Sequence, residues 1–105
     1  MKIKYIDKDS IVFDNGNVIH CFHCADCCEY NYAAFEAIDD VALYTDFHPE
    51  LKFEVVAGSG FRFGNKNKMF FIPCYSVQNG YYSSDVEIYY RDEKILDVRC
   101  EVTPI

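Results

Sequence analysis

The sequence predicts an α+β domain in which one helix covers a twisted, mostly antiparallel β-sheet. Three observations predict it: an Asn-Gly turn between two β-prone runs near the N-terminus, an alternating run over residues 81–91, and helical spacing of apolar residues between 26 and 43. An N-terminal hairpin and a C-terminal meander pair their strands antiparallel, and the helix packs on the resulting sheet. The 105 residues contain no repeat, low-complexity segment or linker, so we expect a single domain over residues 1–105.

The composition indicates a packed core and excludes some classes of partner. Half of the residues are hydrophobic and 17% are aromatic, which is too rich in core-forming side chains for a disordered chain. The net charge is −7, and binding to long DNA or RNA needs a cation for each phosphate contact, so we exclude general nucleic-acid binding. The start of the chain lacks a signal-peptide pattern, and no run approaches about 20 apolar residues. We therefore expect a cytoplasmic protein without membrane contact.

The sequence predicts a strand followed by a hairpin over residues 2–23. Residues 2–6 alternate between polar and apolar side chains, which is typical of a half-buried strand. Residues 10–13 and 18–23 are both β-prone, and the four residues between them contain Asn15-Gly16. An Asn-Gly turn between two such runs is the strongest short-range hairpin signal.

Residues 26–43 fit two structures, of which we favour the helix. Asp26 and Glu29 have the spacing of a capping box at a helix N-terminus. Apolar side chains then recur at helical spacing, namely Cys28, Tyr32, Phe35, Ile38 and Ala42. The alternative is a strand after a turn, in which Tyr30, Tyr32 and Ala34 share one face.

The remaining residues predict an antiparallel meander. Residues 51–55 alternate as a strand, residues 58–60 make a flexible corner, and residues 61–63 and 69–72 are strands around a polar turn. Pro73 is expected to limit the second of these strands or to mark an edge or a bulge. After a turn at Asn79-Gly80, residues 81–91 form a long strand, and a turn over 91–94 leads into a final strand over 95–102.

A cluster of thiols and imidazoles lies at the end of the first hairpin. It contains zinc-ligand residue types in a short space, namely His20, Cys21, His23, Cys24, Cys27 and Cys28. No second ligand pair with zinc spacing follows downstream, and strand alternation would send neighbouring ligands to opposite faces. We therefore expect no metal, and we expect reduced cysteines that pack mostly as small core side chains. A zinc or thiol protein is the alternative.

Two segments have the composition of a ligand-binding rim. In the first, aromatic residues flank an arginine, an arrangement that can stack on a base and pair with a phosphate. In the second, a turn presents two tyrosines and an amide. The candidate ligand-binding residues are Phe61, Arg62, Asn79, Tyr81 and Tyr82. The structural alternative is a flexible loop and a hairpin whose tyrosines pad the sheet.

Two motifs carry a resemblance to a known family. Residues 23–29 fit H-x-x-D-C-C-E, and residues 79–83 fit N-G-Y-Y-S before an alternating strand. Residues 13–16 match an F-x-D-G hairpin with one inserted residue. Together these resemble a family of small domains from bacteria and their phages, in which the first motif is structural; its matching residues here are His23, Asp26, Cys27, Cys28 and Glu29. More remotely, the pattern is similar to phage anti-defence proteins that sequester the cyclic ADP-ribose signals of Thoeris immunity.

The resemblance implies a non-catalytic binding protein of phage or prophage type. Such a sponge has no catalytic residue and no cofactor; it holds a small cyclic nucleotide in an aromatic and arginine-lined pocket, often at the interface of a homo-oligomer. The charge of −7 supports an alternative partner, a host protein. In that case the chain is an acidic interaction module that inhibits a host enzyme or mimics DNA.

Overall fold

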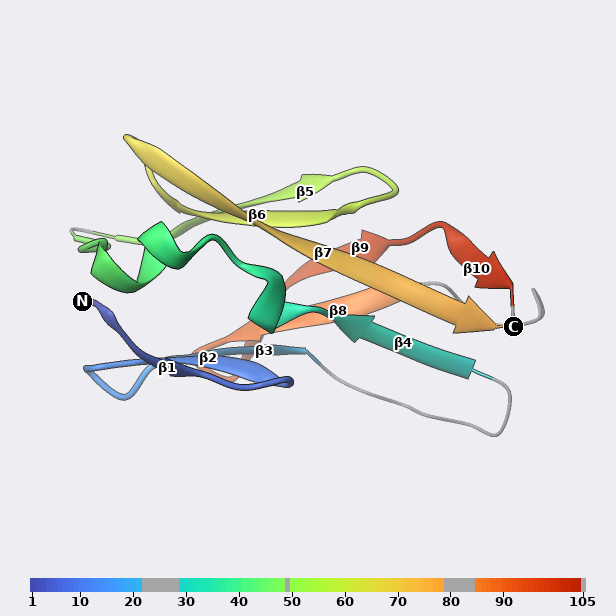
Figure 1. The fold of residues 1–105 in the computed structure, drawn as a ribbon, viewed down its shortest axis with the longest axis horizontal. Coiled ribbons are helices and arrows are strands. Elements are labelled where there is room, and N and C mark those ends of the chain that lie inside the picture. The colour runs from blue at the N-terminus through green and yellow to red at the C-terminus, as the bar shows by residue number, and fades with distance from the viewer. Residues whose placement is uncertain (22–28, 49, 79–84, 105) are drawn as a thin grey trace.

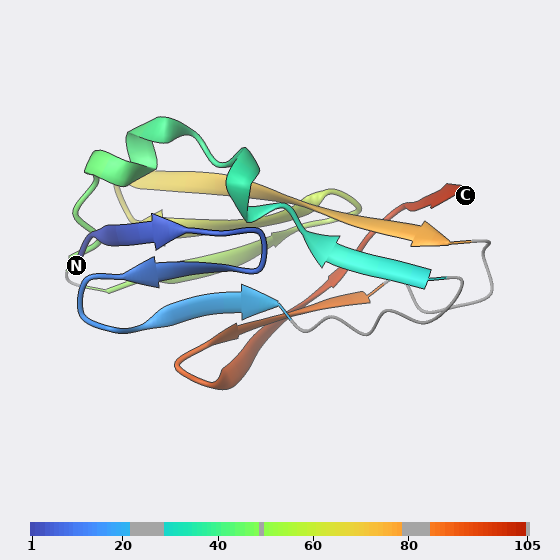
Figure 2. The ribbon, with the colours of Figure 1, turned by 60° about the horizontal axis from the view of Figure 1, so that its bottom comes forward.

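The computed structural model describes residues 1–21, 29–48, 50–78 and 85–104, and it contains two β-sheets that face each other (Figures 1 and 2). The first sheet has the strand order β1-β2-β3-β8-β9. Its strands are β1 (Ile3–Ile6), β2 (Ser10–Phe13), β3 (Val18–Cys21), β8 (Asp85–Tyr90) and β9 (Glu93–Arg99). All of its pairings are antiparallel.

The second sheet is built around one long strand. β7 (Lys68–Gln78) pairs along its first half with β6 (Gly60–Asn65), which in turn pairs with β5 (Lys52–Val56). Along its second half β7 is flanked by β4 (Glu29–Ala33), which is antiparallel to it, and by β10 (Val102–Pro104), which is parallel (Figure 1). The chain passes to the second sheet between β3 and β4, returns to the first between β7 and β8, and passes to the second again between β9 and β10.

The expectation of an α+β fold with a covering helix is wrong. The described part of residues 26–43 contains β4 and two short 3-10 turns, η1 (Phe35–Ala37) and η2 (Asp40–Tyr44). The backbone is extended at Ile38, and the Asp39 carboxylate accepts the N–H of Val41 at 3.0 Å, which starts a new turn instead of continuing a helix. Spacing of three to four residues fits such turns as well as it fits an α-helix.

The strand alternative for this segment is correct for residues 29–33. Asn31 and Ala33 are buried, and Tyr32 packs on the outer face against Tyr75 of β7, with ring centroids 5.4 Å apart. The two 3-10 turns then bridge the sheets on one side, because η1 packs against β7 and η2 against β1 (Figure 2). Asp26 and Cys28 lie outside the described residues.

The N-terminal hairpin is confirmed, but the prediction of one meander in one sheet is wrong. β5, β6 and β7 form a meander in the second sheet, whereas β8 and β9 form a hairpin in the first. The predicted strand over 95–102 is divided between β9 and β10, which belong to different sheets. β2 pairs with β3 around the Asn15-Gly16 turn, with Val12 opposite Val18. β8 and β9 are joined by a tight turn in which both Arg91 (φ 55°) and Asp92 (φ 62°) are left-handed. Two left-handed central residues are the signature of a hairpin turn whose twist matches its strands. Residues 81–84 of the predicted long strand lie outside the described part.

Pro73 does not end its strand, which runs on to Gln78. Its carbonyl accepts the N–H of Ala34 at 2.8 Å, just where β4 ends. Because the nitrogen and the carbonyl of a strand residue face the same side, the missing N–H also points toward the end of β4 and not toward β6. The neighbouring Cys74 N–H donates to the Ser59 carbonyl at 2.9 Å, so β7 remains hydrogen-bonded on its other edge.

The core lies between the two sheets and is largely aromatic. Phe13 of β2 packs edge-on against Phe47 and Phe63, with centroids 5.7 and 6.5 Å away. Phe47 also contacts Phe70 of β7 at 5.8 Å. All four of these rings are buried. Together they join both sheets to the segment that bridges them. Among the described residues, no helix has the length and hydropathy that a membrane crossing requires.

Candidate functional site

The structure separates Phe61 from Arg62. The Phe61 side chain has no solvent-exposed surface and packs edge-on against Phe35, with centroids 6.3 Å apart. Arg62 lies on the opposite face of β6, where it is about half exposed and forms an ion pair with Glu54 of β5. Neighbouring strand residues point to opposite faces, so one ligand cannot be stacked on Phe61 and paired with Arg62.

The other predicted ligand residues, Asn79, Tyr81 and Tyr82, lie outside the described part of the chain, as do His23, Asp26, Cys27 and Cys28 of the H-x-x-D-C-C-E motif. Glu29 is the first residue of β4, and its register partner is Gln78, the last residue of β7. Glu29 is the last residue of the first motif, and Gln78 directly precedes the second in the sequence.

The interior beside this strand pair is polar. Asn31, Ser76 and Gln78 are all buried. The Ser76 hydroxyl donates to Asn31 Oδ1 at 2.5 Å and accepts from Gln78 Nε2 at 2.7 Å. Buried amides and hydroxyls are costly unless they are hydrogen-bonded, so this chain of bonds favours the observed register of β4 on β7.

The three described cysteines, Cys21, Cys74 and Cys100, are buried, as expected for small core side chains. Burial raises the pKa of the Cys21 thiol, and a hydrogen bond with the Cys100 thiol, together with burial, raises the pKa of Cys74. His20 is stacked on Tyr89 at 5.2 Å. In the described ranges no three His, Cys, Asp or Glu side chains gather as metal ligands do. Cys24, Cys27 and Cys28 are outside those ranges.

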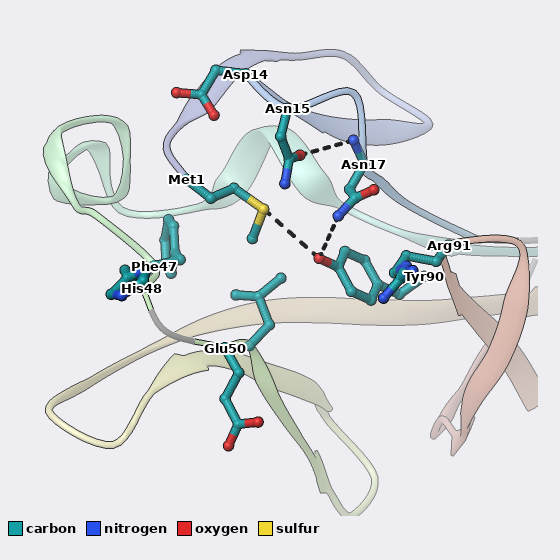
Figure 3. Close-up of a pocket in the computed structure, with 10 residues that line it drawn as sticks. Met1, Asp14, Asn15, Asn17, Phe47, His48, Glu50, Tyr90 and Arg91 are labelled. Atoms are coloured by element: carbon teal, nitrogen blue, oxygen red, sulfur yellow. Dashed lines mark hydrogen bonds between the residues drawn. The ribbon is translucent and has the colours of Figure 1, made fainter.

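A pocket of about 560 Å³ opens at the other end of the molecule, beside the first residue (Figure 3). It lies where the turn between β2 and β3, the turn between β8 and β9, and the segment leading into β5 converge. Its lining consists of Met1, Asp14, Asn15, Asn17, Phe47, His48, Glu50, Leu51, Tyr90 and Arg91. Two turns that the sequence identifies thus supply polar side chains to one concave surface.

The phenol of Tyr90 is fixed in the middle of this pocket (Figure 3). Its oxygen accepts a hydrogen bond from Asn17 Nδ2 at 3.0 Å and points toward the Met1 sulfur, 3.7 Å away. Its ring packs against Phe13 and Phe53, with centroids 6.4 and 5.4 Å apart. These contacts hold the ring in place, while its partial exposure leaves one surface to meet a ligand.

Charged groups surround the pocket at its rim. Arg91 is exposed beside Tyr90, and it has no ion-pair partner among the described residues. Asp14 and Glu50 contribute carboxylates, and that of Glu50 points away from the Tyr90 hydroxyl (Figure 3). The pocket therefore offers an aromatic surface and amides at its centre and a guanidinium at its rim, which are groups that bind polar ring systems.

No local sequence pattern predicts this pocket, although the sequence predicts both of the turns that line it. Asn15, Asn17 and Arg91 read as turn residues and Tyr90 as a strand residue. They meet because β3 pairs with β8, which places Ile19 opposite Tyr90. That pairing joins segments about 70 positions apart, and no local pattern in the sequence reports it.

Comparison of the chain with models of protein families, with curated proteins and with solved structures found no match.

Proposed function

We propose that the protein is a non-catalytic binding protein that holds a small ligand with a planar ring in the pocket around Tyr90. The observation that carries this proposal is the pocket itself, because its volume of about 560 Å³ lies within the range of about 300–1,000 Å³ found for small-molecule sites. Leu51 and Tyr90, which are half-buried, provide apolar and aromatic surface. Around them stand hydrogen-bonding side chains from two turns.

The groups in the pocket are suited to recognition. The Tyr90 phenol accepts a hydrogen bond from Asn17 and donates its O–H to the Met1 sulfur, so its second lone pair is left for a ligand. A thioether is a weak acceptor, and a ligand oxygen can take the O–H in its place. Amides such as Asn15 present a donor and an acceptor together, as the edge of a base requires. Arg91 can pair with an anionic group or stack on a ring.

The finer proposal is that the ligand is a cyclic nucleotide signal and that the protein is an anti-defence sponge of phage or prophage type. It is supported by the H-x-x-D-C-C-E and N-G-Y-Y-S motifs and by the pairing of Glu29, the last residue of the first motif, with Gln78, which directly precedes the second. A sponge needs affinity and no turnover, in keeping with a pocket of binding groups.

Two measurements test the proposal. Small molecules released by heating the purified protein are identified by mass spectrometry, and calorimetry measures binding of the isomers of cyclic ADP-ribose. We expect Tyr90→Phe to weaken binding about tenfold, because one ligand hydrogen bond is lost while the ring remains. Tyr89→Phe is the matched control, since its hydroxyl donates to Glu87 at 2.9 Å and the residue is not part of the pocket. Absence of nucleotide binding at micromolar protein would reject the proposal.

A second candidate function is an acidic module that binds a positively charged host protein. It is supported by the net charge of −7 and by two large side chains on the outer face of β7, Phe71 and Tyr75, each 41% exposed. Recovery of a basic partner from host lysate, with its loss at high salt, would favour this function. The double substitution of Phe71 and Tyr75 by Ser should then abolish recovery without changing nucleotide binding.

A further inference from the structure

A second hollow, of about 320 Å³, adjoins the pocket around Tyr90. The two hollows share His48 and Glu50 as lining residues, so they are neighbouring compartments of one surface. The second hollow is completed by Lys52, Asn65, Lys66 and Asn67, which come from β5 and from the turn between β6 and β7.

Hydrogen bonds fix the shape of this turn. Asn65 Oδ1 accepts the N–H groups of Asn67 and Lys68 at 2.9 and 3.0 Å, and Asn65 Nδ2 donates to the Asp46 carbonyl at 3.2 Å. The last bond ties the turn to the segment that carries His48. On the neighbouring strand Lys52 is the register partner of Gly64, directly before the turn. Lys52 and Lys66 are thus both positioned by β6, the first through its pairing with β5 and the second through the turn that follows β6.

The charge of the second hollow differs from that of the first. Among the described residues that line the second hollow, Lys52 and Lys66 are positive and Glu50 is negative, so their side chains sum to +1. In the first hollow the positive Arg91 is outweighed by the negative Asp14 and Glu50. Neither lysine has an ion-pair partner among the described residues. In a chain of net charge −7, two ammonium groups without an ion pair to any described residue, beside the pocket around Tyr90, favour an anionic ligand group.

We propose that Lys52 and Lys66 form an anion subsite that holds the phosphate of a nucleotide whose ring lies against Tyr90. This inference rests on the proposed function and names the class of ligand, a nucleoside phosphate. Asn67 contributes a further hydrogen-bond donor to the phosphate, and His48 lies between the ring and the phosphate. Glu50 opposes the anion and limits its affinity.

The test compares adenosine with adenosine 5′-monophosphate, which differ only in the phosphate, by calorimetry at low salt. We expect the monophosphate to bind about tenfold more tightly, because charge-assisted bonds to ammonium groups are among the strong ones. In the double variant K52Q/K66Q its affinity should fall to that of adenosine, while adenosine binding stays unchanged. The control K4Q/K8Q alters two exposed lysines outside both hollows by the same charge and should have little effect.

A third variant probes the opposing carboxylate. Glu50→Gln keeps the shape of the side chain and should raise the affinity for the monophosphate several-fold, with no gain for adenosine. Equal affinity of the unmodified protein for both probes, or an equal loss in K4Q/K8Q, would overturn the anion subsite and leave the proposed function standing. A lower affinity in Glu50→Gln would also overturn it. If neither probe nor any cyclic nucleotide binds, the proposed function fails as well.

Discussion

The side-chain amide of Asn17 donates a hydrogen bond to the phenolic oxygen of Tyr90 across 3.0 Å, although 73 positions separate the two residues in the sequence. The bond joins the turn of the first hairpin to the end of β8. It exists because β3 and β8 are neighbours in the first sheet, with Ile19 opposite Tyr90. The same pairing forms one wall of the proposed ligand pocket.

This hydrogen bond should be measurable as a coupling. We expect Asn17→Ala and Tyr90→Phe each to lower the free energy of unfolding by about 1 kcal/mol, the usual net contribution of a partly buried hydrogen bond. The double variant should lose less than the sum, because both single changes remove the same bond. Urea denaturation of the four proteins gives the coupling energy. Strict additivity of the two losses would mean that the bond contributes nothing to stability.

Phe61 and Arg62 should behave as a core residue and a surface residue. Phe61→Ala removes a fully buried ring and should cost about 3–5 kcal/mol of stability, with Phe61→Leu as a milder change that stays folded. Arg62→Ala breaks an ion pair between half-exposed side chains and should cost less than about 1 kcal/mol. Chemical denaturation separates the two. A loss in Arg62→Ala as large as that in Phe61→Leu would contradict this placement.

Gly60 should not tolerate a side chain. A Cβ at this position would lie 2.1 Å from the Ile72 carbonyl oxygen, so β6 and β7 would have to move apart. We expect Gly60→Ala to cost about 3 kcal/mol or to prevent folding. Gly16→Ala is the control: its backbone is left-handed (φ 89°) but its Cβ meets nothing within 4 Å, so the cost should be about 1 kcal/mol. Thermal melts that rank the variants in the reverse order would contradict the close packing at Gly60.

Asp7 should make stability depend on acid pH. Its carboxylate accepts the N–H of Asp9 at 2.8 Å and the hydroxyl of Ser10 at 3.1 Å, and these bonds lower the pKa of Asp7 below the ordinary value of 3.8. A carboxyl whose pKa is lowered by folding stabilises the folded state above its unfolded pKa. That contribution is lost as the pH falls through the lowered value.

NMR titration of the Asp7 carboxyl carbon checks this directly, and we expect a midpoint below 3.8. The variant Asp7→Asn should show a flatter dependence of stability on pH between about pH 5 and pH 2. A midpoint at or above the ordinary value would contradict the hydrogen bonds to Asp9 and Ser10.

Local patterns predict much of the fold. The Asn15-Gly16 turn identifies the first hairpin because its geometry is encoded in neighbouring residues. The alternation of Val86 and Ile88 with polar residues likewise identifies β8, whose inner face is buried. The helix prediction failed because the helically spaced Phe35 and Ala42 lie in two separate 3-10 turns, with an extended backbone at Ile38 between them. The Asp39 side chain caps the second turn.

Local sequence patterns do not predict the candidate site. Phe61 and Arg62 looked alike as ligand groups in the sequence, but burial of one face of β6 assigns them to opposite sides. The pocket around Tyr90 depends on the order of strands in a sheet, which is set by the packing of the whole chain. Lys52 and Lys66 line one hollow for the same reason, because β5 pairs with β6.

The central claim, that a small ligand binds around Tyr90, is tested most directly by mapping the bound ligand on the protein by NMR. Amide shifts are recorded while the nucleotide released by heating, or cyclic ADP-ribose, is added. We expect the largest changes in amide shift at Asn15, Asn17, Leu51, Tyr90 and Arg91, and little change near Gln78 at the end of β7. Changes centred on Asn31, Ser76 and Gln78, with none around Tyr90, would contradict it.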